Sequence, residues 1–319
     1  MKLAAPTAED VRTAQVRLTG FTHQTPVLTS RGLDDITGLK CYLKCENFQR
    51  TGSFKLRGAT NFVQQIPEGD RARGVVAVSS GNHAQAVAYA SRSAGMTATI
   101  IMPEDAPKTK LFNTRDMGAQ VITFDRLKED REALGRKVAA ETGATLIPPY
   151  DHPWTIAGQG TLALELMEEI PDLDALVVCL GGGGMLSGCA LIAKDINPAI
   201  RVFGVEPELA NDYWLSLRAG KPVRVDGNAT IADGLRTPQP GEITFPIVQR
   251  LVEDVLLVSE EEILAAMKYT LTRLKIVAEP SGVVCIAAAM AGKLPVGIER
   301  VGLVVSGGNV DLELLARLA

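Results

Sequence analysis

The chain has 319 residues, of which 46% are hydrophobic and 22% charged, a balance typical of a globular protein with a sizeable buried core. Its 33 basic and 37 acidic side chains leave a formal net charge of −4, which predicts no basic surface and argues against a nucleic-acid partner. No apolar run is long enough for a membrane span or a signal peptide, and the five cysteines lack a zinc-type pair of CxxC motifs. We therefore expect a cytoplasmic protein with reduced cysteines and no membrane partner.

Short apolar runs alternate with helical stretches along the chain. A helix is expected over 8–18, a hairpin-like extended stretch over 39–44, and an alanine-rich helix from about His83. Strands are expected over 74–78, 97–102, 120–124, 145–148, 175–180, 202–205 and 301–305. This alternation indicates the α/β class, with parallel sheets joined by right-handed crossovers. We expect a small mobile domain over 74–150, a large domain built from 1–73 plus 151–319, and a ligand between them.

Three of the expected strands run into turns rich in glycine or hydroxyl side chains. The turn Ser79–His83 precedes a helix, where unpaired N–H groups favour an anion, although a plain helix cap is the alternative. The four glycines Gly181–Gly184 also precede a helix and favour a phosphate cradle over a merely flexible turn. They match neither a P-loop nor a dinucleotide motif. The third turn, Ser306–Asn309, is in isolation a simple strand-to-helix turn.

Lys55 has an unusual setting for a lysine. It lies between Phe54 and Leu56 in a stretch with two glycines, although most lysines are simply solvated. Partial desolvation lowers the pKa of a lysine and lets it form a Schiff base. A lysine together with a phosphate cradle is the combination that a pyridoxal-phosphate enzyme needs.

Four segments together carry a family resemblance: Gly52–Ala59, Ser79–His83, Gly181–Gly184 and Ser306–Asn309. In this order and spacing they resemble the fold-type II pyridoxal-phosphate enzymes, over about 7–318. They look specifically like the branch that holds threonine and serine dehydratases, serine racemases and 3-hydroxyaspartate dehydratases. The resemblance implies a two-domain fold of the tryptophan synthase β type, with parallel-rich twisted sheets and flanking helices. It also implies pyridoxal 5'-phosphate bound in the large domain, and a homodimer.

The resemblance assigns roles to individual residues. Lys55 would hold the cofactor and remove the Cα proton on one face, and Ser80 would act on the opposite face, as in the racemases. The substrate carboxylate would bind the loop of Ser79, Ser80, Asn82 and His83. Asn82 would also bond the ring hydroxyl, and Ser306 would face the pyridine nitrogen. The implied cofactor contacts are Lys55, Phe54, Asn82, Gly181, Gly182, Gly183, Gly184, Met185 and Ser306.

The serine opposite the pyridine nitrogen bears on the reaction type. A neutral partner leaves the ring a weaker electron sink than an acidic partner does, which favours prompt loss of a leaving group from Cβ. We expect a dehydratase that removes water from L-threo-3-hydroxyaspartate, L-serine or L-threonine and forms a 2-keto acid and ammonia. A serine racemase with dehydratase side activity and a short catabolic threonine dehydratase are the alternatives.

Two other classes of protein are disfavoured. A β-replacement enzyme of the same fold usually has a different asparagine loop from the Ser-Ser-Gly-Asn-His form, and a non-enzymatic binding module would need neither Lys55 nor Ser80. Because the chain ends at Ala319, the regulatory domain of the biosynthetic threonine dehydratases is not expected.

A divalent-cation site is expected around two acidic residues. Glu206 and Asp212 offer hard oxygen ligands, although a solvated acidic turn is the alternative. The segment resembles the cation site of serine racemases, which implies that Glu206, the Ala210 carbonyl and Asp212 bind Mg²⁺, with Mn²⁺ or Ca²⁺ as alternatives. The ion would be structural or activating.

Substrate choice depends on the group beyond Cβ. A second carboxylate needs a cationic partner, and Arg131 in the run Asp125–Glu132 is a candidate; a solvated helix with alternating charges is the other interpretation. This run and Ile147–Pro153 look more like the 3-hydroxyaspartate and serine racemase members than like the long threonine enzymes. The role of Glu279 stays open, and His23 and His152 are expected to be structural.

Overall fold

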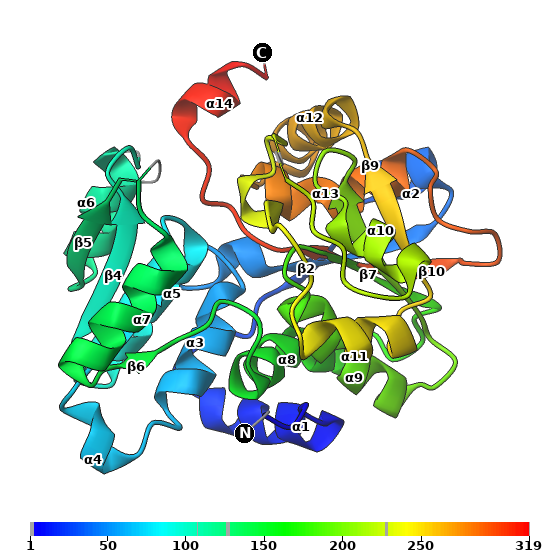
Figure 1. Ribbon diagram of the computed structural model, residues 1–319. Helices are drawn as coiled ribbons and strands as arrows, with labels where there is room; N and C mark the ends of the chain where they lie inside the picture. Colours follow the sequence, from blue (N-terminus) through cyan, green and yellow to red (C-terminus); the bar gives the residue numbers. More distant parts are fainter. Residues whose placement is uncertain (1–2, 107, 126–127, 227–228, 319) are drawn as a thin grey trace.

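The computed structural model describes residues 3–106, 108–125, 128–226 and 229–318, and its strands form two separate sheets (Figure 1). The six-stranded sheet has the order β1 (Val27–Thr29), β2 (Lys40–Cys45), β10 (Arg300–Val305), β7 (Ala175–Cys179), β8 (Arg201–Pro207) and β9 (Asp254–Val258). The four-stranded sheet has the order β5 (Gln120–Phe124), β4 (Ala98–Pro103), β3 (Val75–Val78) and β6 (Thr145–Leu146). Neighbouring strands are parallel except for β1 and β2. The expected α/β class is confirmed.

Helices flank both sheets. They are α1 (Ala8–Leu18), α2 (Arg31–Thr37), α3 (Lys55–Val63), α4 (Glu68–Arg71), α5 (Asn82–Ser93), α6 (Lys108–Asp116), α7 (Arg131–Thr142), α8 (Pro153–Glu169), α9 (Gly184–Ile196), α10 (Asp212–Ala219), α11 (Thr244–Leu251), α12 (Glu260–Tyr269), α13 (Pro280–Met290) and α14 (Leu312–Ala316), with short turns η1 (Glu46–Phe48), η2 (Asp233–Leu235) and η3 (Thr270–Leu274). In the described part of the chain, none is both long and apolar enough to cross a membrane.

The strands expected from the sequence are present, and two details differ. The stretch 39–44 overlaps β2, but its antiparallel partner β1 is separated from it by α2, so the pair is not a tight hairpin. Strands β1 and β9 were not anticipated, because β1 has only three residues and β9 follows a helix without a glycine or proline boundary. The segment 74–150 encloses the four-stranded sheet with α5, α6 and α7. Its status as a mobile domain stays a prediction.

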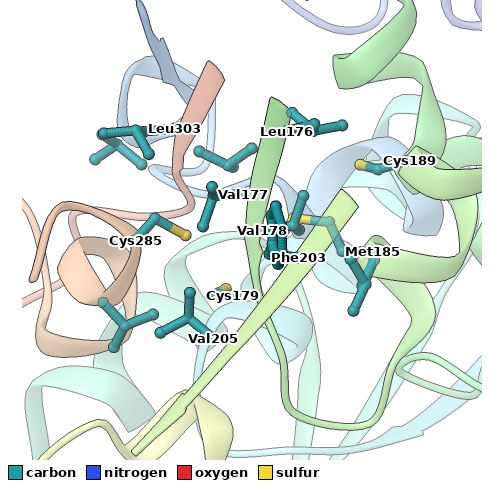
Figure 2. Packing of buried hydrophobic residues seen from close by; sticks show 14 of the residues in the cluster. Leu176, Val177, Val178, Cys179, Met185, Cys189, Phe203, Val205, Cys285 and Leu303 are labelled. Atoms are coloured by element: carbon teal, nitrogen blue, oxygen red, sulfur yellow. The ribbon is translucent and has the colours of Figure 1, made fainter. Parts of the chain in front are cut away.

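The core of the six-stranded sheet is centred on β7 (Figure 2). All five residues of β7 are buried, and β7 contacts α9 and α13. A parallel strand covered on both faces reads as an unbroken apolar run, and the sequence Ala-Leu-Val-Val-Cys has this form. Cys179, Cys189 and Cys285 belong to the same cluster. All five cysteines are free and buried, as expected.

Helix α3 packs closely against α8. A Cβ atom at Gly58 would lie 2.9 Å from the Thr155 carbonyl oxygen, and one at Gly158 would lie 2.6 Å from the Arg57 carbonyl oxygen. Real Cβ atoms do not approach backbone so closely, so this approach of the two helices requires glycine. The contact fixes the distance between α8 and the helix that begins at Lys55.

A buried network of four charges joins this helix pair to β2 and η1. The Arg57 guanidinium donates to both oxygens of Glu46, at 2.8 and 2.9 Å, and to both oxygens of Glu165, at 2.6 and 2.7 Å. Lys44 Nζ donates to Glu165 at 2.6 Å and to the Thr25 carbonyl at 2.7 Å. Arg57, Lys44 and Glu46 are completely buried, and Glu165 is nearly so. Two cations thus balance two carboxylates, and Lys44 and Arg57 hold the pKa of Glu165 below its ordinary value despite its burial.

Removal of Arg57 from this network should be costly. Arg57→Met should lower the free energy of unfolding by about 3–5 kcal/mol, because it leaves two buried carboxylates with a single cation. Arg12→Met, which breaks the exposed pair between Arg12 and Asp195, is the control and should cost below about 1 kcal/mol. Urea unfolding followed by circular dichroism measures both. Equal losses in the two variants would contradict the structural role of the network.

Candidate active site

A cavity of about 240 Å³ lies between the two sheets, at the carboxyl ends of β3, β7 and β10. Its wall is formed by the turns after these strands, by the start of α3, by η2 and by the residues that precede α8 and α13. The carboxyl ends of parallel strands are where open α/β sheets bind ligands, because loops and helix N-termini converge there. The three turns that the sequence singled out therefore meet in one place.

Lys55 is the first residue of α3 and lines this cavity. Its backbone position is set by β10: the Phe54 N–H donates to the Ser306 carbonyl at 3.1 Å, and Ser53 forms a β-bridge with Gly307. Lys55 Nζ donates to the Pro149 carbonyl at 2.9 Å and lies 4.9 Å from the centre of the Phe54 ring. Since successive helix residues are rotated by about 100°, Arg57 points away from Lys55, into the buried network.

The surroundings of Lys55 raise the fraction of its amine that is neutral. Burial lowers the pKa of Lys55 to about 8, although the nearby Cys179 and Glu279 act in the opposite direction. At pH 7 roughly 10% of an amine with this pKa is neutral, against roughly 0.03% for an ordinary lysine. A neutral amine is a nucleophile and a base, which is the chemistry predicted for Lys55 from its sequence context.

The glycines Gly181–Gly184 form the β7–α9 turn and line the cavity. A Cβ at Gly182 would lie 2.3 Å from the Tyr150 ring, one at Gly183 2.0 Å from the Tyr213 hydroxyl, and one at Gly184 2.7 Å from Gln159. Gly183 also has a φ of +87°. Side chains cannot be accommodated here, so the cavity meets bare backbone at the start of an α-helix. This arrangement suits a phosphate group.

The turns after β3 and β10 are joined by hydrogen bonds across the cavity. Asn82 Nδ2 donates to Glu279 at 2.6 Å, and Asn309 Nδ2 donates to Asn82 Oδ1 at 2.8 Å and to the Thr51 carbonyl at 2.8 Å. The role of Glu279 was left open by the sequence; the structure places it in the cavity wall, bonded to Asn82. Nearby, Ser306 presents a neutral hydroxyl that donates to the Ser281 carbonyl at 3.3 Å.

The residues of the β3–α5 turn, which the sequence predicts to bind the substrate carboxylate, also line the cavity. Ser79 Oγ accepts from the Gly81 N–H at 3.2 Å, which shapes the turn. His83 is buried, its Nε2 lies 3.0 Å from the Ile147 carbonyl, and its Nδ1 has no hydrogen-bond partner among the described residues. Burial and the charge of Lys55 lower the pKa of His83 to about 3. A neutral His83 thus ties α5 to the residues after β6.

Arg131 is the first residue of α7, and Asp130 caps this helix by accepting from the Glu132 and Ala133 N–H groups. The Arg131 side chain is 58% exposed and its Nε lies 3.5 Å from Glu132. Arg131 lines the main cavity and also a neighbouring hollow of about 340 Å³ against β4 and β5. The expected charged run 125–132 is therefore partly a turn rather than one helix, and its residues 126 and 127 lie outside the described residues.

Glu206 and Asp212 form a buried pair outside the cavity, at the end of β8 and the start of α10. Glu206 accepts from the Tyr213 and Trp214 N–H groups at 3.1 and 2.9 Å, whereas Asp212 Oδ2 has no partner within the described chain. Burial raises the pKa of both carboxyls, and their mutual repulsion raises that of Glu206 further. Two buried acids, one with an unbonded oxygen, fit a divalent cation. The described residues contain no group of three or more His, Cys, Asp or Glu side chains that could hold a metal, so backbone carbonyls or water would have to supply the remaining ligands.

Comparison with known proteins agrees with this geometry. A family model described as "Pyridoxal-phosphate dependent enzyme" matches residues 18–307. The chain belongs to this family of pyridoxal-phosphate enzymes. It is 51% identical over 309 residues to an L-threo-3-hydroxyaspartate ammonia-lyase from Pseudomonas sp., with 97% of each chain covered. It is 48% identical to a serine racemase from Schizosaccharomyces pombe, over 98% of this chain and 97% of the relative. The structure of maize serine racemase superposes with a TM-score of 0.95 at 42% identity, over 98% and 97% of the two chains.

The cavity of this pyridoxal-phosphate enzyme fits the cofactor. The bare glycine backbone at Gly181–Gly184 would hold the phosphate, Lys55 would hold the aldehyde carbon, and Ser306 and Asn82 lie in the same cavity wall. Phe54 and Met185 also line it. The individual contacts of these residues with the cofactor stay predictions.

Several residues of the site were not anticipated from the sequence. Tyr150 covers the glycine turn, and Asp151 accepts from three N–H groups at the start of α11, those of Glu242, Ile243 and Thr244. Cys179, read as a plain core residue, also reaches the cavity wall. The signal for Tyr150 was weak, since an aromatic residue in a loop has no periodicity that assigns it to one particular neighbour.

The pKa of Lys55 leads to a pH-dependent reaction with the cofactor. We expect cofactor-free protein to bind pyridoxal phosphate covalently with a rate that falls as the pH is lowered through about 8, because the protonated amine is not a nucleophile. The visible absorbance of the lysine-bound cofactor measures the rate. Lys55→Ala, which should show no such absorbance at any pH, is the control. A midpoint near that of an ordinary lysine, about 10.4, would contradict the desolvated environment.

Proposed function

We propose that the enzyme removes water from a small 3-hydroxy amino acid and releases a 2-keto acid and ammonia. The observation that carries this proposal is the neutral Ser306 hydroxyl in the same cavity as the low-pKa amine of Lys55. The named activities of the Pseudomonas and fission yeast relatives, an ammonia-lyase and a racemase, support chemistry at Cα of a hydroxy amino acid.

Each residue has a defined task in this proposal. The cofactor, when bound, supplies an electron sink for the bond electrons released at Cα. Lys55 Nζ takes the Cα proton, and the Ser79–His83 turn at the N-terminus of α5 holds the substrate carboxylate with its N–H groups. Ser306 offers only a neutral partner, so the electrons left at Cα expel the hydroxyl from Cβ, which leaves as water with the proton that Lys55 Nζ took. The released enamine gains a proton at Cβ as it loses one from nitrogen, and water then adds to the resulting imine and displaces ammonia.

The substrate we favour is L-threo-3-hydroxyaspartate. Arg131 is a cation on the wall of the main cavity and could pair with a second carboxylate, which L-serine and L-threonine lack. The identity to the Pseudomonas ammonia-lyase supports this choice. A short catabolic threonine dehydratase would leave Arg131 solvated instead.

Serine racemisation is the second candidate activity, and Ser80 is the observation in its favour. Ser80 and Lys55 line the same cavity, so a hydroxyl is available to exchange a proton with Cα from another direction. The likeness to serine racemases of fission yeast and maize supports the same idea.

We also propose that Glu206 and Asp212, with the Ala210 carbonyl, bind Mg²⁺, or Mn²⁺ or Ca²⁺ in its place. Burial of two acids without a counter-ion is unfavourable, and a cation would relieve it. The ion is structural or activating, because the pair lies outside the cavity wall. A homodimer and a cytoplasmic location remain predictions.

Arg131 should control the choice of substrate. Arg131→Met should raise the KM for L-threo-3-hydroxyaspartate roughly 10- to 100-fold, the equivalent of one charged hydrogen bond, and leave the KM for L-serine unchanged. Arg136→Met, which removes an exposed arginine further along the same helix, should change neither. Keto-acid release from both substrates at equal concentration measures this. An equal loss for both substrates would show that Arg131 does not read the second carboxylate.

Ser80 should matter for racemisation more than for elimination. Ser80→Ala should slow racemisation of L-serine by about 100-fold or more, the usual contribution of a general acid or base, and slow dehydration of the L-substrate only a few-fold. Ser93→Ala, an exposed serine of α5, is the control. D-serine and pyruvate are quantified in the same reaction. Parallel loss of both products would refute separate tasks for Lys55 and Ser80.

A further inference from the structure

Tyr213 links the acidic pair to the glycine turn. It follows Asp212 directly in the first turn of α10, and its backbone N–H donates to Glu206 at 3.1 Å. Its side chain is fully buried and extends to the other site, where its hydroxyl donates to Thr244 Oγ1 at 2.7 Å and lies 3.3 Å from the Gly182 carbonyl. Tyr213 therefore bonds Glu206 of the proposed cation site through its backbone, and it reaches the glycine turn Gly181–Gly184, the proposed phosphate cradle, through its side chain.

The hydroxyls of Tyr213 and Thr244 orient the peptide group between Gly182 and Gly183 in the cradle. Thr244 Oγ1 donates to the Gly182 carbonyl at 2.9 Å, and the Tyr213 hydroxyl lies 3.3 Å from the same carbonyl oxygen. In a trans peptide the carbonyl and the next N–H point in opposite directions, and the described chain has no cis peptide. Holding the Gly182 carbonyl toward Tyr213 therefore turns the Gly183 N–H the other way. That N–H is one of the donors that a phosphate would use.

The position of Tyr213 depends in turn on the acidic pair. Glu206 accepts from the N–H groups of Tyr213 and Trp214, so its carboxylate holds the first turn of α10. Asp212 Oδ1 accepts from Thr237, which lines the active-site cavity, at 3.4 Å, while Asp212 Oδ2 has no partner among the described residues. An ion held by Glu206 and Asp212 together would fix the two side chains that bond the first turn of α10 and Thr237.

We propose that Tyr213 is a positioning residue that couples the cation site to the phosphate cradle, so that Mg²⁺ and pyridoxal phosphate each tighten the binding of the other. This proposal rests on the cation site proposed above and is independent of the substrate. A cation at Glu206 and Asp212 holds the first turn of α10, Tyr213 holds the Gly182 carbonyl, and the cradle keeps its N–H groups directed at the phosphate. By thermodynamic linkage the two ligands raise each other's affinity by the same factor.

The test measures binding and requires no turnover. Full-length cofactor-free protein is titrated with pyridoxal phosphate by calorimetry, with and without saturating MgCl₂, and MgCl₂ is titrated with and without the cofactor. We expect Mg²⁺ to raise the affinity for pyridoxal phosphate roughly 5- to 100-fold in the wild type, the usual range of coupling between two sites. In Tyr213→Phe the factor should fall to about one, while Mg²⁺ still binds, because the backbone N–H to Glu206 remains.

Two further variants separate coupling from packing. Tyr269→Phe is the matched control: Tyr269 packs against the same core cluster, with its hydroxyl beside Gly32, and the Mg²⁺ effect should be unchanged. Thr244→Val removes the other hydroxyl that bonds the Gly182 carbonyl and leaves Tyr213 in place, so it should also reduce the coupling between Mg²⁺ and pyridoxal phosphate. Thermal melting checks that each variant folds. If Tyr213→Phe does not fold, the Mg²⁺ effect in Thr244→Val tests the proposal instead, and a full effect in that variant would contradict it.

The outcomes distinguish this proposal from the one on which it rests. If the wild type binds no Mg²⁺, or if Glu206→Ala binds it as tightly as the wild type, the cation site itself is wrong and the coupling fails with it. If Mg²⁺ binds at Glu206 but leaves the affinity for pyridoxal phosphate unchanged, only the coupling is wrong. If Tyr213→Phe keeps the full Mg²⁺ effect, Tyr213 is not its carrier.

Discussion

The pairing of Arg57 with Glu46 and Glu165 deep inside the protein is the constraint on which the active site depends. Arg57 lies two residues after Lys55 on α3, and its guanidinium is bonded to η1 on one side and to α8 on the other. Buried charges are stable only when fully paired, so α3 has one position in which the network closes. That position, with the bonds from Phe54 and Ser53 to the end of β10, places the Lys55 amine at the carboxyl ends of the strands.

This arrangement separates two kinds of lysine in one protein. Lys44 is completely buried and stays paired with Glu165, so it serves the fold. Lys55 lines the cavity, its amine donates to a carbonyl oxygen and to no carboxylate of the described residues, and its pKa is lowered to about 8. Lys44 donates to a carboxylate whereas Lys55 donates to a carbonyl, and this difference separates the structural lysine from the reactive one. The lysine expected to be the nucleophile therefore lies close to a network whose charges are all paired but is not itself a member of it.

Much of the remaining cavity wall presents backbone groups and neutral side chains, although Arg131 and Glu279 also line it. The glycine turn after β7 offers N–H groups, the turn after β3 offers a helix N-terminus, and Ser306 after β10 offers a neutral hydroxyl. Tyr150, Tyr213 and Gln159 fill the space where side chains on the glycines would lie. An anionic cofactor and an anionic substrate can thus be held by dipoles, which leaves their reactive carbon next to Lys55.

The sequence by itself determined the α/β class, most of the strands, and the three turns and the lysine that meet in the cavity, because each is a local pattern: an apolar run, a glycine cluster, a helix start. It could not place Glu279 against Asn82, Tyr150 over the glycine turn or Tyr213 behind it. Asn82 and Glu279 are 197 residues apart and Gly182 and Tyr213 are 31 apart, and no local pattern connects residues so distant in the chain. Arg131 and the Glu206–Asp212 pair show the same division. Their residue types suggested a ligand, but only the tertiary structure put Arg131 on the cavity wall and buried the two acids together, because burial and the nearness of distant charges are properties of the packed chain.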